Sequence, residues 1–394
     1  MANRFLVSGG TGNYNSTTNW STTSGGASGA SFPTSVDDII IDINSANAPL
    51  NINVVSACKS FSASNYTGTI TMSNNLSVNG TTNTGDITLS SGMTITGNGT
   101  IIKIPTGTNG VITSNGAIFD CNFTFQAAGA TTTTITGAMQ VNKNLTFSLN
   151  STNINTINSG TISVGGDIIH NSPVAGTSTI QLIGSATSTI TQVATRFLQT
   201  NLIINKTGIL NQGNLYWGAT SRTLTYTSGI VNHTGILFTS NNSTLNTNGM
   251  TWNIIQPNAG AINFTSLCNC DKIQQSATTV SLTCGGTFGF NTNYLELITS
   301  NTGNMSFASG KIYYINNSLI YTAISNNGLF RCNSGANAII SLSGNAFMKI
   351  YKVNVSKITA SNKTIRIVDG TVDSGVSQNV FVLDSNINPY SKTF

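Results

Sequence analysis

The chain has 394 residues, of which 7% are charged, and its 16 Lys and Arg against 11 Asp and Glu give a formal net charge of +5. Helix-rich proteins use glutamate freely, and this sequence has one glutamate, Glu296. Nucleic-acid proteins cluster their positive charge, and a membrane-spanning helix needs roughly 20 apolar residues in a row. The composition therefore predicts an all-β protein with no nucleic-acid partner and no membrane insertion.

Apolar residues recur at every second position in short runs along residues 36–345. Leu76 and Val78 form one such run, and Ile87 and Leu89 form the next. The runs end at Asn-Gly, Thr-Gly or Ser-Gly pairs, so the pattern predicts short strands joined by tight turns. Many short strands at near-regular spacing, with no visible linker, favour a parallel β-helix. Stacked β-sandwiches remain the alternative.

The pattern also predicts the core and the two ends. Residues 1–35 are dense in Ser, Thr and Gly, and we expect a loop-rich N-terminal cap or attachment segment there, because the end of a solenoid is a raw sheet edge. Residues 346–394 are expected to form the last coils and a C-terminal cap. A short turn of helix is expected only at residues 191–199. Ten apolar residues are expected to point inward: Leu76, Val78, Ile87, Leu89, Ile95, Phe123, Leu145, Phe147, Leu182 and Ile204.

The first ten residues contain one basic residue and no sustained apolar segment, so we expect no secretory signal peptide. A protein without such a signal is made in a cytoplasm and either stays there or is released by lysis. A bacterial surface adhesin, which needs export or anchoring, is therefore a weaker alternative.

Two stretches near the start of the chain are distinctive: residues 12–20 (GNYNSTTNW) and residues 24–42, which end in VDDIIID. Together they resemble the opening of β-helix proteins common in tailed bacteriophages. Shorter stretches fit the coils of that pattern: residues 58–61, 66–70, 201–208 and 365–370.

Those relatives are virion appendages: tail fibres, tailspikes or head fibres. The resemblance implies a right-handed parallel β-helix, often a homotrimer, located in the virion. Its partners would be other virion proteins or a glycan on the host surface. The function that it implies is structural, in host attachment, with no cofactor.

Some phage β-helices cleave polysaccharide, so a depolymerase is the alternative function. A glycosidase needs two carboxyl groups about 5–10 Å apart. Asp369 and Asp373 lie in turn-like sequence and are weak candidates, and a groove between chains could pair Asp369 or Asp384 with Glu296 of a neighbour. The other acidic residues are weaker candidates for a catalytic role. Asp37 and Asp38 suit an entry turn, while Asp167 and His170 should point to opposite sides of a strand. We therefore expect a protein that is not an enzyme.

Aromatic and basic residues are the candidates for binding. Tyr216, Trp217 and Trp252 could form platforms for sugars, although packing inside the solenoid is the commoner role of such residues. Tyr313 and Tyr314 must face opposite sides, so one of them should point outward. A basic cluster is either a solvated face or a contact surface for a virion protein or an anionic glycan: Lys349, Lys352, Lys357, Lys363 and Arg366.

Six cysteines could in principle hold a metal. Cys268 and Cys270 should share a strand face, with Cys284 nearby, but the spacing lacks the usual Cys-x-x-Cys pairs and a fourth ligand. We expect no metal, and we expect the cysteines to pack as small buried hydrophobic residues.

Overall fold

The computed structural model describes residues 2–383, apart from these gaps: 81–85, 106–108, 128–130, 150–153, 241, 248, 258–260, 276–281, 288, 300–303, 324–327, 333–335, 352, 369–370, 373–376 and 378. The chain forms two compact units. Unit 1 comprises Met1–Asn211 and Ser228–Asn232, and unit 2 comprises Gln212–Thr227 and His233–Phe394.

The first part of the chain contains short strands and two 3-10 helices: β1 (Asn3–Leu6), η1 (Thr17–Asn19), β2 (Trp20–Ser21), β3 (Asp38–Ile40), η2 (Ile43–Ser45), β4 (Leu50–Ile52), β5 (Ser56–Cys58), β6 (Ser60–Ala63), β7 (Ile70–Met72), β8 (Leu76–Val78), β9 (Ile87–Leu89), β10 (Thr94–Lys103), β11 (Gly110–Thr113), β12 (Ile118–Ala127), β13 (Thr132–Thr136), β14 (Ala138–Val141), β15 (Leu145–Leu149), β16 (Asn155–Asn158), β17 (Thr161–Val164), β18 (Ile168–His170), β19 (Val174–Leu182), β20 (Ser188–Gln192) and β21 (Leu198–Gln212).

The described residues of the second part form further strands: β22 (Leu215–Trp217), β23 (Thr223–His233), β24 (Ile236–Thr239), β25 (Ser243–Asn246), β26 (Thr251–Pro257), β27 (Ala261–Phe264), β28 (Cys268–Gln275), β29 (Leu282–Gly286), β30 (Phe290–Thr299), β31 (Asn304–Phe307), β32 (Ile312–Ala323), β33 (Gly328–Cys332), β34 (Ala338–Leu342), β35 (Phe347–Tyr351), β36 (Val353–Ser356), β37 (Ile358–Ser361), β38 (Ile365–Val368), β39 (Thr371–Val372) and β40 (Val380–Leu383).

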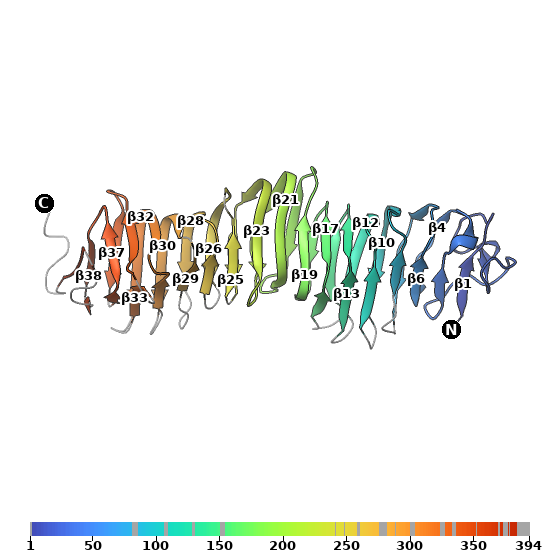
Figure 1. The fold of residues 1–394 in the computed structure, drawn as a ribbon, viewed down its shortest axis with the longest axis horizontal. Helices are drawn as coiled ribbons and strands as arrows, with labels where there is room; N and C mark the ends of the chain where they lie inside the picture. The colour runs from blue at the N-terminus through green and yellow to red at the C-terminus, as the bar shows by residue number, and fades with distance from the viewer. Residues whose placement is uncertain are drawn as a thin grey trace. The chain divides into compact units, whose positions relative to one another are not determined.

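Strands one turn apart pair in parallel in unit 1. Ile39 lies beside Phe61, Phe61 beside Ile87, Ile87 beside Ile112, and Ile112 beside Ile135, so each residue lies one turn after the one before it. Figure 1 shows these strands side by side, from blue to green. This is a parallel β-solenoid, as the alternation of apolar residues predicted, and not a stack of sandwiches.

Unit 2 repeats the same arrangement. Leu215 lies beside Leu237, Leu237 beside Ile255, and Ile255 beside Ile273, and the turns that follow Leu237 are shorter than those of unit 1 named above. Each of these residues is buried. In both units, then, these inward columns of one residue per turn are apolar and buried.

The predicted core is confirmed, since all ten residues expected to point inward are at most 1% exposed. Aromatic rings continue the stacking from turn to turn. The ring of Phe147 stacks on that of Phe125, with centroids 5.7 Å apart and planes 13° apart, and it meets His170 edge to face. Such ring pairs add stabilisation beyond the burial of their apolar surface.

The expected turn of helix at residues 191–199 is wrong. Residues 191–192 end β20, residues 198–199 begin β21, and Thr195 between them has a positive φ of 66° that a right-handed helix cannot contain. The 3-10 helices lie elsewhere, at η1 and η2. Asp42 caps η2, because its side chain accepts a hydrogen bond from the backbone of Asn44.

The N-terminal segment folds around Trp20, which is fully buried. The indole of Trp20 donates a 2.7 Å hydrogen bond to the carbonyl of Tyr14, and the Tyr14 hydroxyl donates to the carbonyls of Pro33 and Ala57. β1 pairs with β2 in the antiparallel sense and with β3 in the parallel sense. The domain boundaries at residues 35 and 345, and the right-handed sense of the helix, stay predictions.

Candidate functional site

Polar side chains gather on the outward face of β26, β28, β30 and β32 in unit 2. Along β28, Cys270 and Ile273 are buried, whereas Asp271, Lys272 and Gln274 are partly exposed. The register places Cys270 beside Thr292 and Lys272 beside Tyr294. An open pocket of about 320 Å³ lies on this face, and we call it the amide pocket. It is lined by Thr251, Asn269, Cys270, Asp271, Asn291, Asn293 and Asn316.

Hydrogen bonds between successive turns fix the side chains of the amide pocket. The Asn293 amide donates to a carboxylate oxygen of Asp271 at 2.8 Å. The Asn316 amide donates in turn to the amide oxygens of Asn291 and Asn293, at 3.1 and 3.2 Å. The result is a ladder of amides, which stacks without the repulsion that like charges would cause. Because the ladder is already ordered, little side-chain entropy remains to be lost when a ligand binds.

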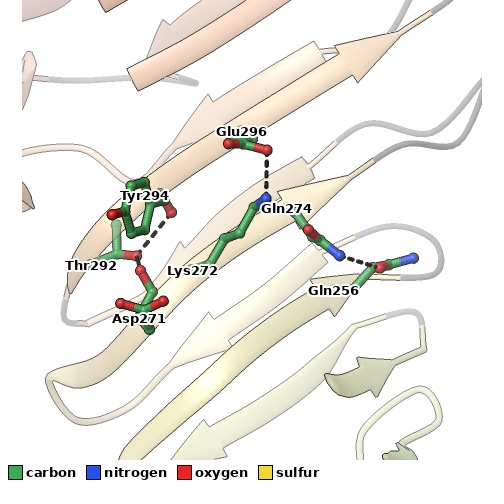
Figure 2. Close-up of polar contacts among 7 residues, drawn as sticks. All are labelled: Gln256, Asp271, Lys272, Gln274, Thr292, Tyr294 and Glu296. Atoms are coloured by element: carbon green, nitrogen blue, oxygen red, sulfur yellow. Dashed lines mark hydrogen bonds and ion pairs between the residues drawn. The ribbon is translucent and has the colours of Figure 1, made fainter. Parts of the chain in front are cut away.

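Two further polar pairs lie beside this ladder, and Figure 2 shows them. Lys272 Nζ lies 2.6 Å from Glu296 Oε2, with both side chains about one quarter exposed. The Gln274 amide donates to Gln256 at 2.8 Å. The ion pair balances the charges of Lys272 and Glu296, whereas Asp271 adds an acidic group to the amide pocket.

Two tyrosines border the amide pocket. Tyr294 follows Asn293 directly in the chain and is 36% exposed, while Tyr314 lies beside Asn291 on the next strand and is 42% exposed. The hydroxyl of Thr292, below Tyr294, lies 3.0 and 3.1 Å from the carbonyl oxygens of Tyr294 and Asp271 and closes the strand bend (Figure 2). Two exposed tyrosines thus lie next to the amide ladder in the chain and in the register, although neither is among the described residues that line the pocket.

The prediction that Trp217 and Trp252 form sugar platforms is wrong, because both indoles are buried in the core. Trp252 packs edge to face on His233, with ring centroids 4.7 Å apart. Tyr216 does point outward, but its ring stacks on Phe238 at 4.4 Å and is only partly accessible. The prediction for the tyrosine pair is confirmed, since Tyr313 is buried and Tyr314 is exposed.

The basic cluster is only partly described. Lys352 and the side chain of Arg366 lie outside the described residues. Lys363 lines a second pocket, of about 460 Å³, together with Ala346, Phe347, Met348 and Thr364. Its ammonium donates to the carbonyls of Ala346 and Gly344. Neither Lys349 nor Lys357 is among the described residues that line this pocket.

The candidate acids Asp369 and Asp373, and Asp384 with them, lie outside the described residues. Among the described acids, Asp37 accepts hydrogen bonds from Thr34 and from the backbone of Ala2. Burial alone would raise the pKa of Asp37, but these hydrogen bonds lower it below its usual value. Asp37 is thus part of a turn, as the sequence indicated.

Asp167 and His170 do point to opposite sides of the chain. Asp167 accepts a 2.8 Å hydrogen bond from the backbone of Thr189, whereas His170 is fully buried. Burial, with a smaller contribution from the charge of Arg196, lowers the pKa of His170 to about 4. The pair therefore forms no acid–base dyad.

All six cysteines are buried free thiols, which confirms their expected role as small core residues. Burial raises the pKa of the Cys121 thiol to about 12. Within the described part of the chain, no group of three or more His, Cys, Asp or Glu side chains is placed to hold a metal ion. The described part also contains no helix that is long and apolar enough to cross a membrane.

The sequence contained a signal for the amide pocket that alternation alone does not reveal. Asn291 lies beside Asn269 in the register of β28 and β30, and Asn293 lies one turn after Asp271. Asn316 lies one turn further, within hydrogen-bonding distance of Asn293. The spacing of these residues equals the length of a turn, so the side chains align. To find these aligned residues from the sequence, one needs the number of residues in each turn, and the alternation of apolar residues does not give that number.

No protein-family model matches the chain, and searches of curated proteins and of solved structures likewise found no match.

Proposed function

We propose that the chain is a structural protein of a tailed-bacteriophage virion, of the tail-fibre or spike type, which contacts a saccharide without cleaving it. The observation that carries the saccharide contact is the amide pocket with its two bordering tyrosines, Tyr294 and Tyr314. The resemblance at residues 12–20 and 24–42 supports the virion assignment, and a stacked parallel solenoid suits such an appendage.

The chemistry of the amide pocket suits a neutral saccharide. Amide groups both donate and accept hydrogen bonds, as the neighbouring hydroxyl groups of a sugar do. The rings of Tyr294 and Tyr314 offer apolar faces for the C–H side of a sugar ring, and their hydroxyl groups remain polar. The Lys272–Glu296 pair balances its own charges and the pocket adds the acidic side chain of Asp271, so no unbalanced positive charge is left there to attract an anionic glycan.

The described carboxylates favour contact over catalysis. Glu296 is held by Lys272 at 2.6 Å, and Asp271 accepts from Asn293 at 2.8 Å. Both carboxyl groups are thus already engaged by partners within the protein. Several weak sites on one appendage, or on a homotrimer, would raise the overall avidity by effective concentration.

An array of immobilised neutral and anionic oligosaccharides tests this proposal. The purified chain is expected to be retained on neutral saccharides, and incubation with the bound saccharide is expected to release no shorter products. Release of oligosaccharides would favour the depolymerase alternative, and retention on anionic saccharides alone would point to the basic cluster instead. Antibodies against the chain are expected to label purified virions, and light scattering reports whether it is a trimer.

A further inference from the structure

A lysine and an aspartate are buried together inside unit 1. Lys103 ends β10, and Asp86 directly precedes β9. The Lys103 Nζ atom lies 2.8 Å from Asp86 Oδ2, and the two side chains are 0% and 1% exposed. Lysine and aspartate are almost never fully buried unless they are paired, and the cost of removing both from water can exceed the attraction between them. This pair therefore calls for a reason beyond simple stabilisation.

The space around the Lys103–Asp86 pair is closely packed and leaves no room for larger neighbouring side chains. A side chain at Gly80 would collide with the Asp86 carboxylate, and one at Gly110 would collide with both Asp86 and Lys103. The backbone N–H of Val111 donates a 3.1 Å hydrogen bond to Asp86 Oδ2. The carbonyl of Asp86 accepts a 2.8 Å bond from the backbone of Phe61, which holds the aspartate in place.

Burial moves both groups toward their neutral forms. It raises the pKa of Asp86, and the attraction of Lys103 only partly opposes this. It lowers the pKa of Lys103, against the attraction of Asp86. The neighbouring groups do not reverse these two pKa shifts. The charge of Lys59 is paired with Asp38 at 3.6 Å, and burial raises the pKa of the Cys58 thiol, which keeps it protonated. Both shifts thus favour the neutral amine, which is a nucleophile, and the neutral carboxyl group.

We propose that Lys103 and Asp86 condense into an intramolecular amide, which covalently joins β10 to the residue before β9. The Nζ lone pair of the neutral amine attacks Asp86 Cγ, and an N–C bond forms. A proton moves from Nζ to the departing carboxyl oxygen, the C–O bond breaks, and one water leaves. No oxidant or other reactant is needed.

The structure favours each part of this step. Holding the two groups in contact replaces an encounter between molecules, for which effective concentrations reach about 10⁵–10⁸ M. The N–H of Val111 is aimed at the oxygen on which negative charge develops, as in an oxyanion hole. The water that leaves passes from an apolar interior into solvent, which disfavours the reverse reaction.

The Lys272–Glu296 pair of unit 2 is a matched control within the same chain. Its atoms are closer, at 2.6 Å, but both side chains are about one quarter exposed. Burial is what favours the neutral amine over the ammonium, and the Lys272–Glu296 pair lacks that burial. Proximity alone would join both pairs, whereas the mechanism proposed here joins only Lys103 and Asp86.

Mass spectrometry of the full chain, purified under denaturing conditions, tests the proposal. The wild-type chain is expected to be lighter than its sequence by the mass of one water, while Lys103→Met and Asp86→Ala variants should have the mass of their sequences. These masses do not depend on whether the variants fold. Lys272→Met is expected to keep the deficit of one water.

Tryptic digestion locates the bond. Trypsin should not cleave after an acylated Lys103, so residues 60–143 should appear as one peptide, one water lighter than its sequence and without fragment ions from cleavage between Asp86 and Lys103. Cleavage after Lys272 should be normal. A wild-type mass equal to that of the sequence, with ordinary cleavage after Lys103, would overturn the proposal. A deficit that persists in the Lys103→Met variant would overturn it as well.

Discussion

Replacing Phe147 by Ala tests whether ring stacking between turns stabilises unit 1. Phe147 is fully buried, its ring stacks on Phe125 in the preceding turn, and it meets His170 in the following one. Removing a buried Phe side chain costs about 3–5 kcal/mol where the site cannot collapse. The backbones of the neighbouring turns are held by the parallel ladder, so we expect little collapse and a loss of about 4 kcal/mol.

Urea denaturation followed by tryptophan fluorescence measures this loss. Trp20 lies in unit 1, whereas Trp217 and Trp252 lie in unit 2, so a Trp217→Phe/Trp252→Phe background makes the signal specific for unit 1. Val55→Ala is the control, because that side chain also lies in unit 1 and is 76% exposed, and its loss is expected to cost under about 0.5 kcal/mol. A cost below about 1 kcal/mol for Phe147→Ala would refute the claim that the stacked rings form a tightly packed column.

Two further predictions concern the backbone and the pH dependence of stability. Gly97 has φ 129°, and an added Cβ would collide with the backbone of Met72. Gly97→Ala should therefore destabilise unit 1 by roughly 1–3 kcal/mol. This loss should clearly exceed that of Gly92→Ala, where an added Cβ meets nothing within 4 Å. Equal urea midpoints for these two variants would contradict the close approach of the turns. Burial lowers the pKa of His170 and of His233 to about 4, whereas an unfolded histidine titrates near 6.5. The unfolded state thus binds protons first as the pH falls, so stability should decrease from about pH 6.5 to pH 4, and a His170→Phe variant should show a shallower decrease in urea midpoints; an unchanged slope would count against a buried neutral His170.

The period of the apolar residues was sufficient to predict the strands and the core. Leu76, Val78, Ile87 and Leu89 were identifiable because side chains alternate across a strand, so burial follows from spacing alone. The parallel pairing also followed, because short strands with Asn and Gly turns and no linkers suit a solenoid. Local spacing carried this information, and no contact between distant residues was needed.

Which of two neighbouring residues faces inward was harder to predict near strand ends. Tyr216 and Trp217 must face opposite sides, and nothing within that pair decides which is buried. The pairing of Leu215 with Leu237 fixes the phase, and it places Trp217 inside. The sugar platform predicted at Trp217 failed for this reason.

The amide pocket and the buried pair depend on the length of each turn. Asn291 lines a pocket with Asn269 only because the chain between them completes one turn of the solenoid. Lys103 follows the buried Ile101 at the second position, so alternation indicates that it points inward, but its partner Asp86 is brought to it by the path of the chain between them. Turn lengths differ among the registers described above, and the sequence alone does not fix them.

The central claim, that the amide pocket binds a neutral saccharide, is tested most directly by calorimetric titration of the chain with a neutral oligosaccharide selected on the array. Tyr294→Ala/Tyr314→Ala is expected to weaken binding roughly tenfold or more, because aromatic contacts of this kind contribute about 0.5–1.5 kcal/mol each beyond burial. Phe347→Ala, which removes an exposed ring outside the amide pocket, should bind like the wild type. Unchanged affinity in the double tyrosine variant would contradict the claim, and a loss confined to Phe347→Ala would place the contact at the second pocket instead.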